Sequence, residues 1–157
     1  MSSPKKTYTV DEALVKLQRY CAYQDRCHKE VMQKLKEMQM VSQATEQIIL
    51  ALIEEDYLNE ERFAMAFVRG KFKIKKWGRR RLMSELKQRN ISKYLIQKAL
   101  NQVSDVEYQA TFEALAHKKA NSLKGISALK KKKKLADYLL YRGWESHLVY
   151  EKINQFF

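Results

Sequence analysis

The sequence has little glycine and almost no proline, with four Gly and one Pro among 157 residues. Because these two residues supply most tight turns, their scarcity argues against β-hairpins and favours helices. Two cysteines in a chain of this length do not make a disulfide framework, and their number predicts a cytoplasmic location. No apolar run approaches the roughly 20 residues that span a bilayer, and the start, MSSPKKTYT, lacks the apolar segment of a secretory signal. We expect no membrane partner.

Acidic residues are also few relative to basic ones. The chain has 31 Lys and Arg against 18 Asp and Glu, a net charge of +13 and a pI near 9.7. A pI above about 9 is typical of proteins that bind nucleic acid. The 45% hydrophobic content can form a core, so general disorder is not expected.

Residue patterns that indicate an active site or a metal centre are missing. No Gly-x-x-x-x-Gly-Lys phosphate loop occurs, and His117 and His147 stand without a catalytic partner nearby in sequence. Cys21, Cys27 and His28 lack the spacing and the second ligand pair of a structural zinc site. We therefore expect neither an enzyme nor a bound cofactor or metal.

Apolar residues recur at spacings of three and four, which predicts about nine short amphipathic helices and no strands. Possible helix caps fall between these stripes. The expected N-caps are Thr9, Ser42, Asn59, Ser92 and Ser104, and the expected helix stops are Asn90, Gly125 and Gly143. The predicted fold class is all-α.

The helices repeat along the chain. RLMSELKQRNISKYLIQKAL (residues 81–100) aligns without gaps on KLADYLLYRGWESHLVYEKI (residues 134–153), so that Leu82 meets Leu135 and Asn90 meets Gly143. EVMQKLKEMQM (residues 30–40) fits the same frame. The alternative is that any two amphipathic helices can be aligned, but the matching turn residue favours a real repeat. We predict three tandem three-helix units at residues 9–58, 59–104 and 105–157, after a disordered tail at residues 1–8.

The most informative stretch is Glu55–Leu86, which contains the basic and aromatic segment KFKIKKWGRRR, in which apolar residues separate seven cations. Such a cluster predicts a surface for a polyanion or an acidic protein, and the alternative is a solvated basic face. The candidate binding residues are Lys71, Lys73, Lys75, Lys76, Arg79, Arg80 and Arg81, followed less specifically by Lys130, Lys131, Lys132, Lys133 and Lys134. We expect Arg79 and Arg81 at the exposed start of a helix. Trp77 and Trp144 could stack on bases, but such aromatic residues are more often core residues.

At these residues the chain resembles the central repeat of the RecX family, bacterial modulators of the recombinase RecA. The residues that carry the resemblance are Tyr57, Leu58, Arg62, Phe63, Ala64, Gly78, Arg81, Glu85 and Leu86. The resemblance covers roughly residues 11–157, with strong motifs only between residues 52 and 100. Gln39 and Asn90 stand where a turn glycine is expected in this family.

The resemblance implies an elongated, curved, monomeric protein that lies in the groove of the RecA–DNA filament. It would bridge protomers there, suppress ATP hydrolysis and strand exchange, and so regulate recombination, DNA repair and the SOS response, with weak preference for DNA sequence. The alternative is an autonomous nucleic-acid-binding protein that uses its repeats as helix-turn-helix modules. The candidate recognition helix near Lys93–Val103 has few Arg, Asn or Gln residues in a readable stripe, which disfavours that alternative.

Overall fold

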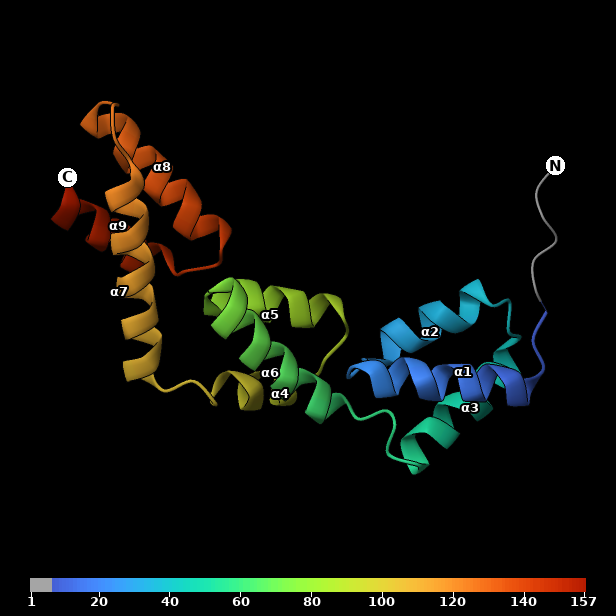
Figure 1. Ribbon diagram of the computed structural model, residues 1–157. Helices are drawn as coiled ribbons and strands as arrows, with labels where there is room; N and C mark the ends of the chain where they lie inside the picture. Colours follow the sequence, from blue (N-terminus) through green and yellow to red (C-terminus); the bar gives the residue numbers. More distant parts are fainter. Residues whose placement is uncertain (1–6) are drawn as a thin grey trace, which may run out of the picture.

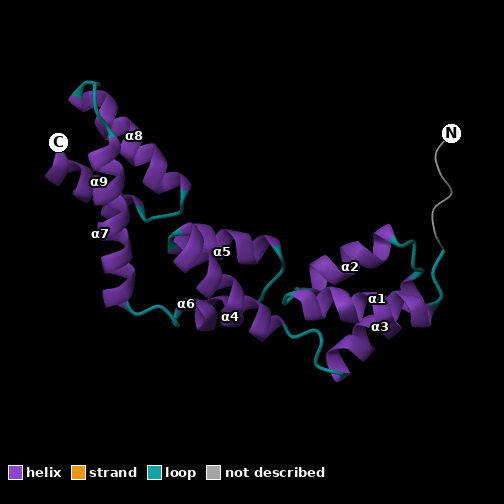
Figure 2. Ribbon diagram, in the orientation of Figure 1, coloured by secondary structure: helices purple, strands orange, loops and turns teal. Residues whose placement is uncertain are grey.

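The computed structural model describes residues 7–157, which form nine α-helices and one π-helical turn and contain no strand. In chain order these are α1 (Val10–Tyr23), α2 (His28–Glu37), α3 (Ser42–Glu54), α4 (Glu60–Gly70), η1 (Lys71–Lys75), α5 (Arg79–Gln88), α6 (Lys93–Leu100), α7 (Asp105–Ser122), α8 (Ala128–Tyr141) and α9 (Ser146–Phe156). The all-α prediction is confirmed (Figure 2). Of the predicted disordered tail, all but Thr7 and Tyr8 lies outside the described residues.

The helices form three groups in series, α1–α3, α4–α6 and α7–α9, called here the first, second and third units. Figure 1 shows them along an elongated, bent molecule, with the N-terminal segment at one end and the C-terminus at the other. Helices that pack closely, such as α1 with α3, α4 with α6 and α8 with α9, belong to the same unit. The predicted tandem, curved arrangement of three-helix repeats is therefore confirmed. No helix of the described residues is long and apolar enough to cross a membrane.

The same turn follows the second helix of each unit. Its left-handed residue is Gln39 (φ 60°), Asn90 (φ 59°) or Gly143 (φ 90°). In each copy the backbone N–H of the left-handed residue donates to the carbonyl three residues earlier, at a distance of 3.0 Å. The N–H of the following residue donates to the carbonyl five residues before it. The residues before the turn also match, because Leu35, Leu86 and Leu139 are all 0% exposed. The structure thus repeats the frame found in the sequence.

This turn also decides where the third helix of each unit begins. Ser92 caps α6, as predicted, by accepting from the backbone N–H of Leu95. The prediction that Ser42 caps α3 is wrong, because the cap is Val41 and Ser42 is already helical. Val41, Ser92 and Glu145 each stand two residues after the left-handed turn residue, so position in the turn, not side-chain type, fixes the cap. The predicted caps Thr9, Asn59 and Ser104 are confirmed.

The hydrophobic core has two parts of unequal extent. One part lies within α1–α3 and closes against Leu58 in the linker that follows them. The other runs without interruption through the second and third units, from Phe63 to Ile153. The first unit adds only the fully buried thiol of Cys27 to it, and burial raises the pKa of that thiol to about 11. The second and third units therefore share one core, whereas the first unit has its own.

Candidate nucleic-acid interface

The basic segment begins with a π-helical turn rather than an α-helix. The N–H of Lys76 donates to the carbonyl of Lys71, five residues earlier, and also to that of Phe72 (3.2 Å). Because a π turn is wider than an α turn, it changes which side chains face the core. Phe72 is 2% exposed, whereas Ile74 is 78% exposed, with Lys73 and Lys75 also exposed beside it. The turn presents an apolar side chain between cations to solvent.

This turn forms one wall of a groove whose other walls are α7 and α8. The groove has a volume of about 670 Å³ and is called here the basic groove. Its lining residues are Ile74, Lys75, Lys76, Ala110, Thr111, Ala114, Leu115, Lys118, Lys119, Ser122, Tyr138 and Arg142. Five of these residues are cations and none is a carboxylate. Such a surface attracts phosphate groups and repels other cations.

An aromatic ring orders two of these cations. The guanidinium of Arg142 lies 3.7 Å from the ring centroid of Tyr138, and the Lys119 ammonium lies 4.8 Å from the same centroid. Ala110 and Ala114 provide small side chains on the facing side of α7. Because these alanine side chains are short, a ligand backbone can approach α7 closely while the cations lie on either side of it.

The structure does not place the second half of the basic segment as expected. Arg79 and Arg81 lie in the first turn of α5, as expected, but they are only partly exposed, so the expectation of an exposed position is wrong. Arg79 pairs with Asp105 at 2.8 Å and lies over the ring of Tyr108. The carboxylate of Glu145 is a further neighbour of Arg79, at 3.9 Å.

Arg81 is equally engaged. Its guanidinium lies over the rings of Trp77 (4.1 Å) and Tyr141 (4.7 Å), and it donates to the backbone carbonyl of Tyr141. Cations at a helix N-terminus are opposed by the helix dipole, and the rings and carbonyl around Arg81 compensate for this. Arg80 alone of the three arginines is exposed, as Lys73, Lys75 and Lys76 are in the first half of the segment. Lys71 is half-buried near Phe67 and Trp77.

These arginines belong to a close contact between the second and third units, called here the seam, in which residues 76–81 meet residues 142–145. The N–H of Gly78 donates to the carbonyl of Arg142 (2.8 Å), and that of Arg80 to Gly143 (3.0 Å). A methyl group on Gly78 would lie 2.5 Å from the Gly143 carbonyl oxygen, so no larger residue fits. The seam fixes the two units relative to each other.

Aromatic residues fill the space behind the seam. Trp144 is 0% exposed and donates from its indole nitrogen to the carbonyl of Lys76 (3.0 Å). The rings of Phe72, Tyr108 and Phe112 lie around it. The hydroxyl of Tyr108 accepts from the backbone N–H of Arg79 and donates to Glu145, while burial raises the pKa of this phenol. The core interpretation of Trp144 is confirmed.

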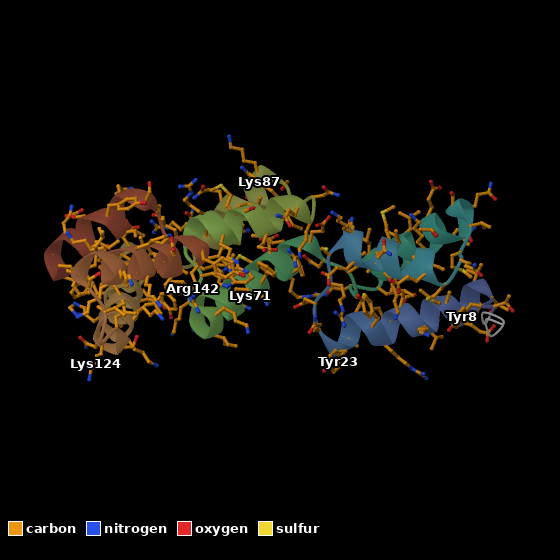
Figure 3. All side chains as sticks on the ribbon, turned by 90° about the horizontal axis from the view of Figure 1, so that it is seen from above. Tyr8, Tyr23, Lys71, Lys87, Lys124 and Arg142 are labelled. Atoms are coloured by element: carbon orange, nitrogen blue, oxygen red, sulfur yellow. The ribbon has the colours of Figure 1, made fainter. Side chains whose placement is uncertain are left out.

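The Lys130–Lys134 run forms the first turns of α8 and does not line the basic groove. Lys130, Lys133 and Lys134 are exposed, and Lys133 pairs with Asp137 at 3.0 Å. The run therefore surrounds the helix instead of forming one face. Figure 3 shows the side chains around Lys71 and Arg142 in the middle of the molecule.

The remaining motif residues connect the first and second units. Arg62 binds Asp25 at 2.7 Å and Asp56 at 3.2 Å, and it donates to the backbone carbonyl of Asp56. Nearby, His28 lies 3.2 Å from Glu60, whose pKa is raised by burial and lowered in part by the histidine. Polar contacts thus hold this joint, in contrast to the aromatic core behind the seam. Phe63, Ala64 and Leu86 are buried core residues of the second unit.

Sequence reasoning missed the third unit's contribution to the basic groove. Lys118, Lys119, Tyr138 and Arg142 come from α7 and α8, more than 40 residues beyond the π turn. No local spacing connects them to Lys75, because only the packing of the third unit on the second brings them together. The adjacent lysines Lys118 and Lys119 in α7 are a sign of a basic surface in the sequence, but they do not show which other segment lies beside them.

Two family models match this chain. The second three-helix domain of RecX matches residues 59–100, and the third matches residues 105–153. The regulatory protein RecX of Chlorobium phaeobacteroides is 31% identical over 133 residues, which are 85% of each chain. That of Lactobacillus gasseri is 28% identical over 153 residues, which are 96% of this chain and 56% of that protein. The chain thus spans about half the length of the first relatives it matches.

A solved structure gives the same fold. RecX from Lactobacillus salivarius superposes with a TM-score of 0.77 at 24% identity, covering 94% of this chain and 96% of that one. The seam and the second and third copies of the repeated turn lie within the ranges that the two family domains match. Together with the match to the Chlorobium protein over most of both sequences, these findings show that the chain belongs to the RecX family of regulatory proteins.

Proposed function

We propose that this protein regulates the RecA recombinase by lying along the RecA–DNA filament with its basic groove toward the DNA, which suppresses ATP hydrolysis and strand exchange. Membership of a regulatory family supports the proposal. The observation that carries it is the basic groove, where five cations from two units meet without a carboxylate. Phosphates are the groups that such a surface binds most readily, with little dependence on base sequence.

The shape of the molecule suits a long partner. Three units in series offer contacts spread over a length that a compact domain of the same size lacks (Figure 1). Weak contacts made by linked units add through effective concentration when their spacing matches the partner. One molecule would then constrain several recombinase protomers, and inhibition would need fewer copies than there are protomers.

The test is a titration of the DNA-dependent ATPase of preformed filaments of the cognate RecA. We expect inhibition well below one copy of this protein per recombinase. The variant Lys75→Gln, Lys76→Gln, Lys118→Gln should inhibit less, because it removes three exposed charges from the basic groove. If all three meet duplex phosphates, its log–log salt slope of DNA binding should fall by about 2.7 units.

A matched control carries three Lys→Gln changes at exposed positions outside the groove, Lys36, Lys87 and Lys93. Its net charge is the same, so it separates groove contacts from general attraction. Figure 3 shows Lys87 projecting from the opposite side of the molecule to Lys124. An unchanged ATPase at equimolar protein, together with retained DNA binding, would contradict the proposal and favour the autonomous DNA-binding alternative.

A further inference from the structure

Helix α1 carries two stripes of side chains, of which the inner one is buried and the outer one is largely exposed. Ala13, Leu17 and Cys21 form the inner stripe and are buried in the core of the first unit. The outer stripe carries Lys16, Arg19, Tyr20 and Tyr23 at helical spacings of one, three and four residues. Tyr20 packs partly against the core of the first unit, so Tyr23 is the ring of this stripe that packing does not explain.

The outer stripe forms a groove with residues before and after the helix, called here the tyrosine groove. It has a volume of about 930 Å³. Its lining residues are Tyr8, Asp11, Glu12, Val15, Lys16, Arg19, Tyr20, Tyr23, Arg26 and Lys34. Figure 3 shows Tyr8 and Tyr23 at opposite ends of α1 along one edge of the molecule. Helix α1 has 14 residues, so at about 1.5 Å per residue it is about 21 Å long.

Cations and rings alternate in this groove. Arg26 lies 3.7 Å from the ring centroid of Tyr20, with Lys34 at 5.6 Å from the same centroid. Lys16 lies 4.9 Å from the centroid of Tyr8. Tyr23 is 84% exposed, although a tyrosine ring gains stability from burial.

Charge favours an anionic ligand. The groove has four cations and two carboxylates, and the carboxylates of Asp11 and Glu12 belong to the first turn of α1. Glu12 has a structural use there, because its side chain accepts from the backbone N–H of Thr9. Arg26 is largely buried and lies 3.9 Å from Glu30, so Arg19 is the exposed cation at the Tyr23 end of the groove.

We propose that the tyrosine groove binds single-stranded nucleic acid, with a base stacked on the exposed ring of Tyr23 and phosphates on the adjacent cations. Every base has a flat face that stacks on an aromatic ring, whereas a duplex covers its base faces. The proposal is independent of the proposed function, since it uses α1 and not the basic groove. The groove also lies N-terminal to both ranges that match the family models.

The test compares the binding of three fluorescent probes to the whole 157-residue chain: an oligothymidine, an abasic oligonucleotide of the same length and a duplex. Binding is measured in the variant with Lys75, Lys76 and Lys118 changed to Gln, so that the basic groove contributes little. We expect Tyr23→Ala to weaken oligothymidine binding about tenfold, and Tyr23→Phe to retain it. Because Tyr23 is exposed, its removal should leave the fold intact, which circular dichroism checks.

Two controls make the outcome decisive. Tyr94→Ala removes an equally exposed tyrosine on α6, 73% exposed, and should leave binding unchanged. Photo-crosslinking with 5-iodouracil in the oligonucleotide should label Tyr23. Equal binding of the abasic probe, or full binding by Tyr23→Ala, would overturn the proposal. If polyglutamate also displaced the probe at the same charge concentration, the groove would be a site for acidic protein segments instead.

Discussion

Single residues decide how closely the second and third units approach each other. Gly78 and Gly143 face each other across the seam. A methyl group on Gly78 would lie 2.5 Å from the Gly143 carbonyl oxygen, and one on Gly143 would lie 2.3 Å from Arg81. The neighbouring Arg79 and Arg81 are held by rings and carboxylates instead of facing solvent. Both motif residues, Gly78 and Arg81, are therefore explained by packing and not by ligand contact.

The first prediction tests this explanation. Gly78→Ala should lower the free energy of unfolding by about 1–3 kcal/mol, because its methyl group meets backbone atoms that cannot move aside. The same change at Gly70, which is helical and has no atom within 4 Å of the added methyl, should raise it by about 0.5–1 kcal/mol. Urea unfolding of both variants provides the measurement. Equal effects at the two positions would show that the seam is not tightly packed.

At the scale of elements, the repeated turn is the feature that the three units share most closely. Its left-handed position carries Gln39, Asn90 and Gly143, and these residues differ in how well they tolerate positive φ. A glutamine there is strained, an asparagine less so, and a glycine not at all. The first unit therefore has the least favourable version of the turn.

The second prediction follows from this ranking. Gln39→Gly should stabilise the first unit by about 1 kcal/mol, since it removes the cost of a left-handed side chain. Asn90→Gly should give a smaller gain in the second unit. Gln47→Gly, the same change at an exposed site within α3, should cost about 1 kcal/mol because glycine weakens helices. A loss of stability in Gln39→Gly would contradict this account of the turn.

Sequence patterns predicted the elements better than they predicted the site. The three-and-four spacing and the caps gave the helices, and the alignment of Asn90 with Gly143 gave the repeated turn. The π turn was not predictable. Its hydrogen bond spans five residues instead of the four of an α-helix, and a single such turn leaves no periodic pattern of apolar residues in KFKIK. The basic groove was only half predicted, since Lys118 and Arg142 reach it through packing between units.

At the scale of the whole molecule, the two joints between units differ in kind. The seam has backbone hydrogen bonds and a continuous aromatic core behind it. The joint between the first and second units relies on the ion pairs of Arg62, on His28 with Glu60, and on the buried Cys27. Ion pairs at exposed positions contribute little stability and are weakened by salt. The first unit should therefore change its orientation more easily than the third.

The third prediction concerns this joint. Arg62→Ala should change overall stability by less than about 1 kcal/mol, but it should broaden the distribution of distances between spin labels on α1 and α6. Labels on α6 and α9 should keep their narrow distribution. Arg69→Ala, which removes a hydrogen bond to Gln102 inside the second unit, is the control and should leave both distributions unchanged. A narrow α1–α6 distribution in Arg62→Ala and in 1 M salt would contradict a polar joint.

The unequal joints also give the molecule a mechanical order of failure. If its two ends are pulled apart, the load passes through both joints in series, so the weaker one yields first. The Arg62 ion pairs should open at low force and add a small extension, whereas the seam should resist until the shared core unfolds in one larger step. A protein bound along a filament that stretches or shortens could then follow the change through its first joint while its second and third units keep their hold.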